Sequence, residues 1–207
     1  MTGNRRRWQV GGGWIPSLKT ESQRETNLMK MMTCPTAAKP ADVLPETGAS
    51  RGGTYRAWRI ETRLASPLWG SYGMNVYIPF AAVRAVGYRP DPRMWTTADV
   101  SRTATIPVLL DGGWVTGAVY HAELAPPQFD LIPTMPVSPP PPVAFCMNRH
   151  WGHVNGLFMD WSVRKVGLKE LWTLKWSTDF DTAGPWTKAG GVQPKDWPQW
   201  MRKYRDY

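Results

Sequence analysis

The residues with the clearest capacity for chemistry lie in the C-terminal third of the sequence. Cys146, His150 and His153 follow the spacing Cys-x3-His-x2-His, and thiolate and imidazole are ligands that suit zinc. Asp160 or Cys34 could supply a fourth ligand. The spacing matches no common zinc motif, and its odd separation turns His150 and His153 toward opposite faces of a strand. In a structural alternative, His150 and Asp160 hydrogen-bond to backbone groups and fix a hairpin.

The two cysteines, Cys34 and Cys146, support two further hypotheses. They could form one disulfide that closes a long loop, a question that geometry decides. Cys146 could instead act as a nucleophile with a histidine base, but no flanking motif supplies an orienting group or an oxyanion donor. We therefore expect no enzymatic activity.

A second metal hypothesis concerns the segment from Ser177 to Thr182. Asp179 and Asp181 offer carboxylate oxygens two residues apart, as calcium-binding loops do. Two carboxylates are few for calcium, so an exposed turn is the alternative reading. No other cofactor is expected.

Composition limits the folds that could position these residues. Proline accounts for 20 and glycine for 19 of the 207 residues, and 13 more are tryptophan. So many helix-breaking residues exclude a coiled coil or a helical bundle. A hydrophobic fraction of 42% excludes general disorder. The length and composition predict one loop-rich domain that contains a sheet and an aromatic core.

The net charge of +9 favours an anionic partner, but the basic residues cluster only at the two ends, in Arg5–Arg7 and Arg202–Arg205. Nucleic acid therefore stays the weaker alternative among partners. No apolar run approaches the roughly 20 residues that span a bilayer. The basic residues after Met1 lead into glycines rather than an apolar core, so we expect no export signal in this sequence.

Local patterns predict the elements along the chain. We expect a basic, flexible start over 1–12, a short helix over 14–24 and a loop over 37–53. Extended segments are predicted at 28–33, 55–60, 70–78 and 106–110, with a turn over 111–113. A proline-rich loop follows over 125–143. The clearest pattern is a hairpin with strands 153–159 and 162–166, then a short helix over 168–174 and an irregular, tryptophan-rich tail over 175–207.

The hairpin segment, His150 to Arg164, resembles a known family. His150 and Asp160 have the spacing of a signature, His followed by nine residues and Asp-Gly, near the C-terminus of pilin-like proteins from planctomycete-type bacteria; Trp161 replaces its glycine. These proteins are related to the major pseudopilin of type II secretion and carry a prepilin cleavage and methylation motif. Further blocks that resemble the family are 34–40, 70–75, 164–176, 186–194 and 197–201.

The resemblance implies an α+β fold over residues 1–207. It would be a single pilin-like head domain with an antiparallel sheet, long Pro/Gly-rich loops, and a C-terminal hairpin with a short helix. The family's basic leader and its apolar N-terminal helix have no counterpart here, so we expect a head domain without that helix. In the family the helix makes the contact with the membrane, so we expect no membrane contact from the residues present. The implied function is structural, as a subunit of a type II secretion pseudopilus or a type IV pilus-like filament.

In that role the partners would be other pilin or pseudopilin subunits in a homopolymer, together with a secretion or pilus assembly platform. The location would be the cell envelope or outside the cell. Type II pseudopilins often bind calcium in a C-terminal loop, which adds support to Asp179 and Asp181. The alternative from another class is a stand-alone basic, tryptophan-rich module that binds nucleic acid or an anionic glycan.

Overall fold

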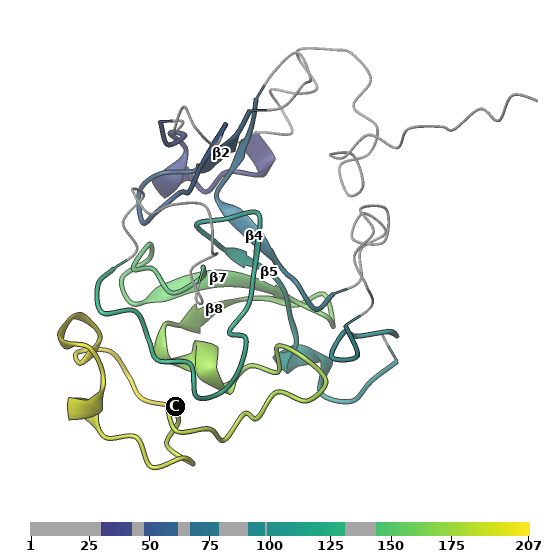
Figure 1. Cartoon of the computed structure of the whole chain (residues 1–207), viewed down its shortest axis with the longest axis vertical. Coiled ribbons are helices and arrows are strands. Elements are labelled where there is room, and N and C mark those ends of the chain that lie inside the picture. The colour runs from purple at the N-terminus through teal and green to yellow at the C-terminus, as the bar shows by residue number, and fades with distance from the viewer. Residues whose placement is uncertain (1–29, 43–47, 62–66, 79–90, 98, 131–143) are drawn as a thin grey trace, which may run out of the picture.

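The computed structural model describes residues 30–42, 48–61, 67–78, 91–97, 99–130 and 144–207 (Figure 1). The predicted start over 1–12, the helix over 14–24 and residues 131–143 of the proline-rich loop lie outside these ranges. Residues 125–130 of that loop have no regular secondary structure. No helix in the described ranges is long and apolar enough to cross a membrane.

A five-stranded sheet forms the centre of the molecule. Its strand order is β6-β4-β5-β7-β8. The strands are β4 (Tyr72–Asn75), β5 (Pro107–Asp111), β6 (Thr116–Gly117), β7 (His153–Phe158) and β8 (Val163–Gly167). All pairs are antiparallel except β4 with β6, which is parallel. The sheet is therefore mixed, whereas the sequence predicted an antiparallel one.

The predicted hairpin is confirmed. Burial alternates along β7, because Val154, Gly156 and Phe158 are buried while His153, Asn155 and Leu157 are partly exposed. Four residues, 159–162, separate the two strands, rather than the predicted two. A hydrogen bond from the Phe158 N–H to the Ser162 carbonyl (2.9 Å) encloses a loop of the three residues 159–161. Trp161 is the last of these three, and its φ of 65° is a left-handed conformation. Three-residue hairpin loops commonly need this conformation at that position, where glycine is the usual residue.

A smaller sheet packs beside the first (Figure 1). It has the order β1-β2-β3, with β1 at Ala49–Ser50, β2 at Trp58–Ile60 and β3 at Leu68–Gly70. The predicted loop over 37–53 therefore contains a short strand. β3 and β4 are separated only by Ser71, so the chain passes from one sheet to the other at this residue.

The predicted strand over 28–33 is wrong in its described part, because Lys30 and Met31 are helical. The segment still reaches the sheets, since the Met32 carbonyl accepts a hydrogen bond from the Ser71 N–H (2.9 Å). Proline suits the first position of a helical turn, and Pro35 begins one here.

The helical elements with defined bounds in the described residues are all short 3-10 turns. They are η1 (Pro35–Ala37), η2 (Thr103–Thr105), η3 (Lys169–Thr173), η4 (Pro194–Asp196) and η5 (Gln199–Met201). η3 confirms the predicted helix over 168–174.

Tryptophans from the tail and from η3 fill the main core together with residues of the large sheet. Trp172, Trp176 and Trp197 are at most 1% exposed. The Trp176 ring stacks on Phe145 at 5.3 Å, and the Trp172 ring meets Trp197 edge to face at 5.6 Å. The indole N–H of Trp172 donates to the Leu124 carbonyl at 2.7 Å. The tail is irregular in path but forms part of the core.

Candidate functional site

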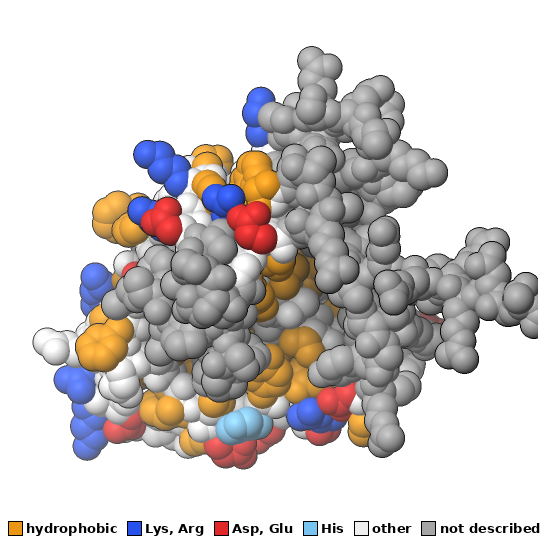
Figure 2. All heavy atoms as spheres, turned by 45° about the horizontal axis from the view of Figure 1, so that its top comes forward, with side chains coloured by type: hydrophobic (Ala, Val, Ile, Leu, Met, Phe, Trp, Pro, Cys, Tyr) orange, Lys and Arg blue, Asp and Glu red, His pale blue; other side chains and the backbone are white. Residues whose placement is uncertain are grey.

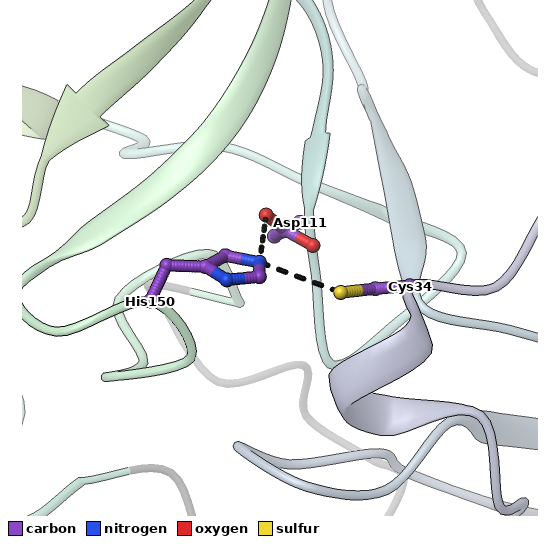
Figure 3. A group of neighbouring side chains, drawn as sticks. All are labelled: Cys34, Asp111 and His150. Carbon is purple, nitrogen blue, oxygen red and sulfur yellow. Dashed lines mark hydrogen bonds and ion pairs between the residues drawn. The ribbon is translucent and has the colours of Figure 1, made fainter.

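Three side chains from distant parts of the chain meet where the two sheets adjoin (Figure 3). Cys34 precedes η1, Asp111 ends β5, and His150 lies just before β7. His150 Nε2 lies 3.4 Å from Cys34 Sγ and 3.2 Å from the Asp111 carboxylate. Cys34 is 2% exposed and the Asp111 side chain is fully buried, while the His150 side chain is 23% exposed. Solvent therefore reaches this cluster from the histidine side.

The Asp111 carboxylate is held from two further directions. The Arg149 guanidinium donates to Asp111 Oδ1 at 3.2 Å, and the Asn155 N–H donates to Oδ2 at 2.6 Å. Both members of the Arg149–Asp111 ion pair have fully buried side chains. The pair and its hydrogen bonds fix the orientation of the carboxylate before any ligand is present.

Arg149 also connects the carboxylate to the smaller sheet's side of the molecule. Its guanidinium donates to the carbonyls of Ser71 (2.5 Å), Gly53 (2.7 Å) and Thr54 (3.2 Å). The buried cation is thus surrounded by one carboxylate and three carbonyl oxygens, which compensate its desolvation.

The three side chains do not have the geometry of a nucleophilic triad. In such a triad one histidine nitrogen takes the proton of the nucleophile while the other is held by the carboxylate. Here the same atom, His150 Nε2, faces both Cys34 Sγ and the Asp111 carboxylate. The arrangement can instead hold a metal ion, because one ligand atom from each residue lies within 4.8 Å of the others.

The structure separates the residues of the predicted zinc set. Cys34 and His150 do meet, but Cys146 Sγ lies 4.0 Å from Met201 Sδ in the main core. Burial raises the pKa of the Cys146 thiol well above its usual value, which makes it a poor nucleophile. His153 Nδ1 lies 3.2 Å from the Trp151 carbonyl.

The proposed Cys34–Cys146 disulfide is not formed, since both thiols are free and each has a different neighbour. Sequence reasoning also missed Asp111, which was assigned to a turn. The available signal was its position directly after an apolar run, because the strand formed by that run can include the next residue, as β5 includes Asp111. Burial and pairing with Arg149 could not be read from that pattern.

Asp160 and His150 have different roles, although the sequence grouped them. Asp160 Oδ1 accepts hydrogen bonds from the Ser162 N–H (3.0 Å) and the Ser162 hydroxyl (2.6 Å) within the hairpin loop. These bonds hold the pKa of the Asp160 carboxyl below its usual value. His150 directs its ring toward Asp111 and Cys34 instead.

The two aspartates considered for calcium are exposed and engaged locally. Asp179 Oδ1 accepts from the Ser177 hydroxyl at 2.6 Å, and Asp181 Oδ1 accepts from the Ala183 N–H at 2.8 Å. Such bonds are typical of turns. Calcium binding at this loop stays a prediction.

No family model, curated protein or solved structure matches this chain.

Proposed function

We propose that this chain is the head domain of a subunit of a type II secretion pseudopilus or a type IV pilus-like filament, with a structural and not an enzymatic role. The observation that carries the proposal is the exposure of Trp151 and Trp161, which are 92% and 79% accessible to solvent. Tryptophan is enriched in the buried centres of protein interfaces. Two tryptophans held out in solvent suit a molecule that works through contacts.

The backbone at these two tryptophans adds to the argument. Trp151 has a φ of 55° and Trp161 a φ of 65°. A left-handed conformation costs a residue other than glycine about 1–2 kcal/mol. Neither side chain gains compensating burial within the described residues. Strained backbone conformations cluster at functional sites, which supports a binding role for these two tryptophans.

The placement of the two tryptophans favours a chain of subunits over a closed dimer. Trp151 lies before the first residue of β7, and Trp161 lies in the loop after its last. The six residues of β7 rise roughly 20 Å, so the two side chains mark opposite ends of the hairpin. A contact between unlike ends of neighbouring copies is heterologous, and heterologous contacts that do not close into a ring give open filaments.

The blocks that carry the family resemblance also pack together. The Ser71 hydroxyl donates to the Ala37 carbonyl at 2.5 Å, and Cys34 meets His150. These contacts join the blocks 34–40, 70–75 and 150–164. Their convergence supports reading them as parts of one structural unit.

The same tryptophans leave the alternative of a module for nucleic acid or an anionic glycan. On the face drawn in Figure 2, hydrophobic side chains reach the surface at several places with Lys and Arg side chains among them. Aromatic rings stack on bases, and cations attract phosphate. A salt titration of DNA binding distinguishes this function, because binding through phosphates weakens steeply as salt rises.

The filament proposal is tested by sedimentation velocity of the full chain over a range of concentrations. We expect the wild type to form a ladder of oligomers and both Trp151→Ala and Trp161→Ala to remain monomeric. Phe129→Ala, at an equally exposed aromatic residue outside the hairpin (75%), should associate like the wild type.

A mixture of the two tryptophan variants makes the test directional. Each retains one intact end, so one heterologous contact can form between them and no further subunit can add. We expect a dimer and nothing larger. Self-association that survives both substitutions contradicts the proposal. Monomeric wild type that binds DNA in a salt-dependent manner supports the alternative.

A further inference from the structure

We propose that Cys34, Asp111 and His150 bind one divalent metal ion of the zinc type, which clamps the segment before η1 to the end of β5 and to the segment just before β7. The proposal is independent of the filament role, because it rests on a buried cluster and not on the exposed tryptophans.

The distances within the cluster fit a zinc ion. Zn–N, Zn–O and Zn–S bonds of about 2.0–2.3 Å at tetrahedral angles place neighbouring ligand atoms about 3.3–3.6 Å apart. The separations here are 3.4 Å between His150 Nε2 and Cys34 Sγ and 3.2 Å between the same nitrogen and the Asp111 carboxylate. The nitrogen is thus at the separation expected from each of the other two donors, and all three ligand atoms lie within 4.8 Å of one another.

Hydrogen bonding alone accounts less well for this convergence. His150 Nε2 carries either a proton or a lone pair. With a proton it can donate to Asp111, which leaves the Cys34 sulfur as a weak acceptor at its side. With a lone pair it can accept from the thiol but then faces the lone pairs of the carboxylate. A cation at the centre is favourable to all three groups.

The surroundings of Asp111 match those of a metal-binding carboxylate. Ligating carboxylates are commonly oriented by hydrogen bonds from a second layer of residues. Arg149 and the Asn155 N–H provide such bonds at 3.2 and 2.6 Å. Arg149 neutralises part of the charge of the Asp111 carboxylate. The remaining negative charge of the carboxylate and the Cys34 thiolate suits one divalent ion. Binding of the ion releases the Cys34 thiol proton to solvent.

The donor set selects the kind of metal. Calcium and magnesium prefer oxygen ligands throughout, whereas a thiolate with an imidazole suits zinc and its neighbours. Three protein ligands leave a fourth position for water, and the 23% exposure of the His150 side chain provides an opening on that side.

The test uses the reduced full chain, freed of metal by dialysis against a chelator and titrated with Zn²⁺ in competition with a chromophoric chelator. We expect one equivalent to bind. Cys34→Ser and His150→Gln should each weaken binding by at least about 100-fold, more than the loss of an outer-layer contact. Cys146→Ser is the matched control, a buried cysteine outside the cluster, and should bind as tightly as the wild type.

Substitution with Co²⁺ tests the Cys34 ligand in a protein that keeps all three proposed ligands, so the result does not depend on how well Cys34→Ser folds. A thiolate ligand gives Co²⁺ a charge-transfer absorption in the near ultraviolet. Since the chain has two cysteines, this band in Cys146→Ser can only come from Cys34. Absence of the band in Cys146→Ser, or a Zn²⁺ affinity unchanged in Cys34→Ser, overturns the proposal. Failure of the wild type to bind either ion overturns it as well.

Discussion

At the scale of single residues, Arg149 links the Asp111 carboxylate of the cluster to the backbone beside the smaller sheet. Its guanidinium contacts Asp111 and the carbonyls of Gly53, Thr54 and Ser71, and its side chain is fully buried. Buried ion pairs are weak sources of net stability, but removal of one partner leaves an uncompensated charge in the core. The consequence of losing Arg149 should therefore exceed that of losing an exposed arginine.

We predict that Arg149→Met lowers the free energy of unfolding by about 3–5 kcal/mol, because Asp111 is left buried without its counter-ion. Urea denaturation followed by tryptophan fluorescence measures the change. Arg56→Met is the matched control, because its partner Asp42 is 97% exposed and such surface pairs contribute about 0–1 kcal/mol. Similar losses for the two variants would show that burial of the pair does not matter.

At the scale of elements, the β7–β8 hairpin combines a well-defined register with a strained loop. The pairs from His153 with Gly167 to Leu157 with Val163 run without interruption. The loop, however, places Trp161 where the left-handed conformation favours glycine.

We predict that Trp161→Gly stabilises the fold by about 0.5–1 kcal/mol. It relieves a backbone cost of about 1–2 kcal/mol, and the greater freedom of glycine in the unfolded chain offsets part of that gain. The same substitution should abolish the self-association proposed for the tryptophan. Thermal unfolding of the monomeric chain tests the first effect.

Trp161→Ala separates the contribution of the backbone from that of the ring. Alanine keeps the left-handed strain and should not stabilise the fold. If alanine and glycine raise the stability equally, the ring rather than the backbone is the source of the effect.

At the scale of the whole molecule, the irregular tail belongs to the same core as the sheet. Trp197 is 1% exposed and contacts the rings of Trp172 and Trp186. The Lys169 ammonium lies 4.9 Å from its ring centroid and pairs with Asp206 near the C-terminus at 2.7 Å. A chain segment without strands is therefore fixed by aromatic packing and by the buried Lys169 cation.

We predict that Trp197→Ala costs about 3–5 kcal/mol of stability, through the cavity it leaves. If the tail and the sheet unfold as one unit, the near-ultraviolet circular dichroism signal and the tryptophan fluorescence should change at the same urea concentration. Trp197→Phe is the control that retains an aromatic ring and should cost less. Separate transitions for tail and sheet in the alanine variant would contradict a shared core.

Local patterns were sufficient for the elements whose signals lie within a few residues. The spacing of a tight turn predicted the hairpin with strands 153–159 and 162–166, and the apolar spacing over 168–174 predicted η3. The same patterns failed for residues 30–33, the described part of the strand predicted over 28–33, where an apolar run lies beside Pro35. They also missed β1, a strand of two residues with no period to detect.

The sequence by itself determined the hairpin and the aromatic character of the core, and it indicated Cys34 and His150 as candidate ligands. Only the tertiary structure decided their partner, because Asp111 reaches them through the pairing of β5 with β7, a contact between residues far apart in the chain. It also kept Cys34 and Cys146 apart, in different neighbourhoods. Side-chain chemistry is encoded locally, whereas the meeting of three side chains depends on how the sheets pack.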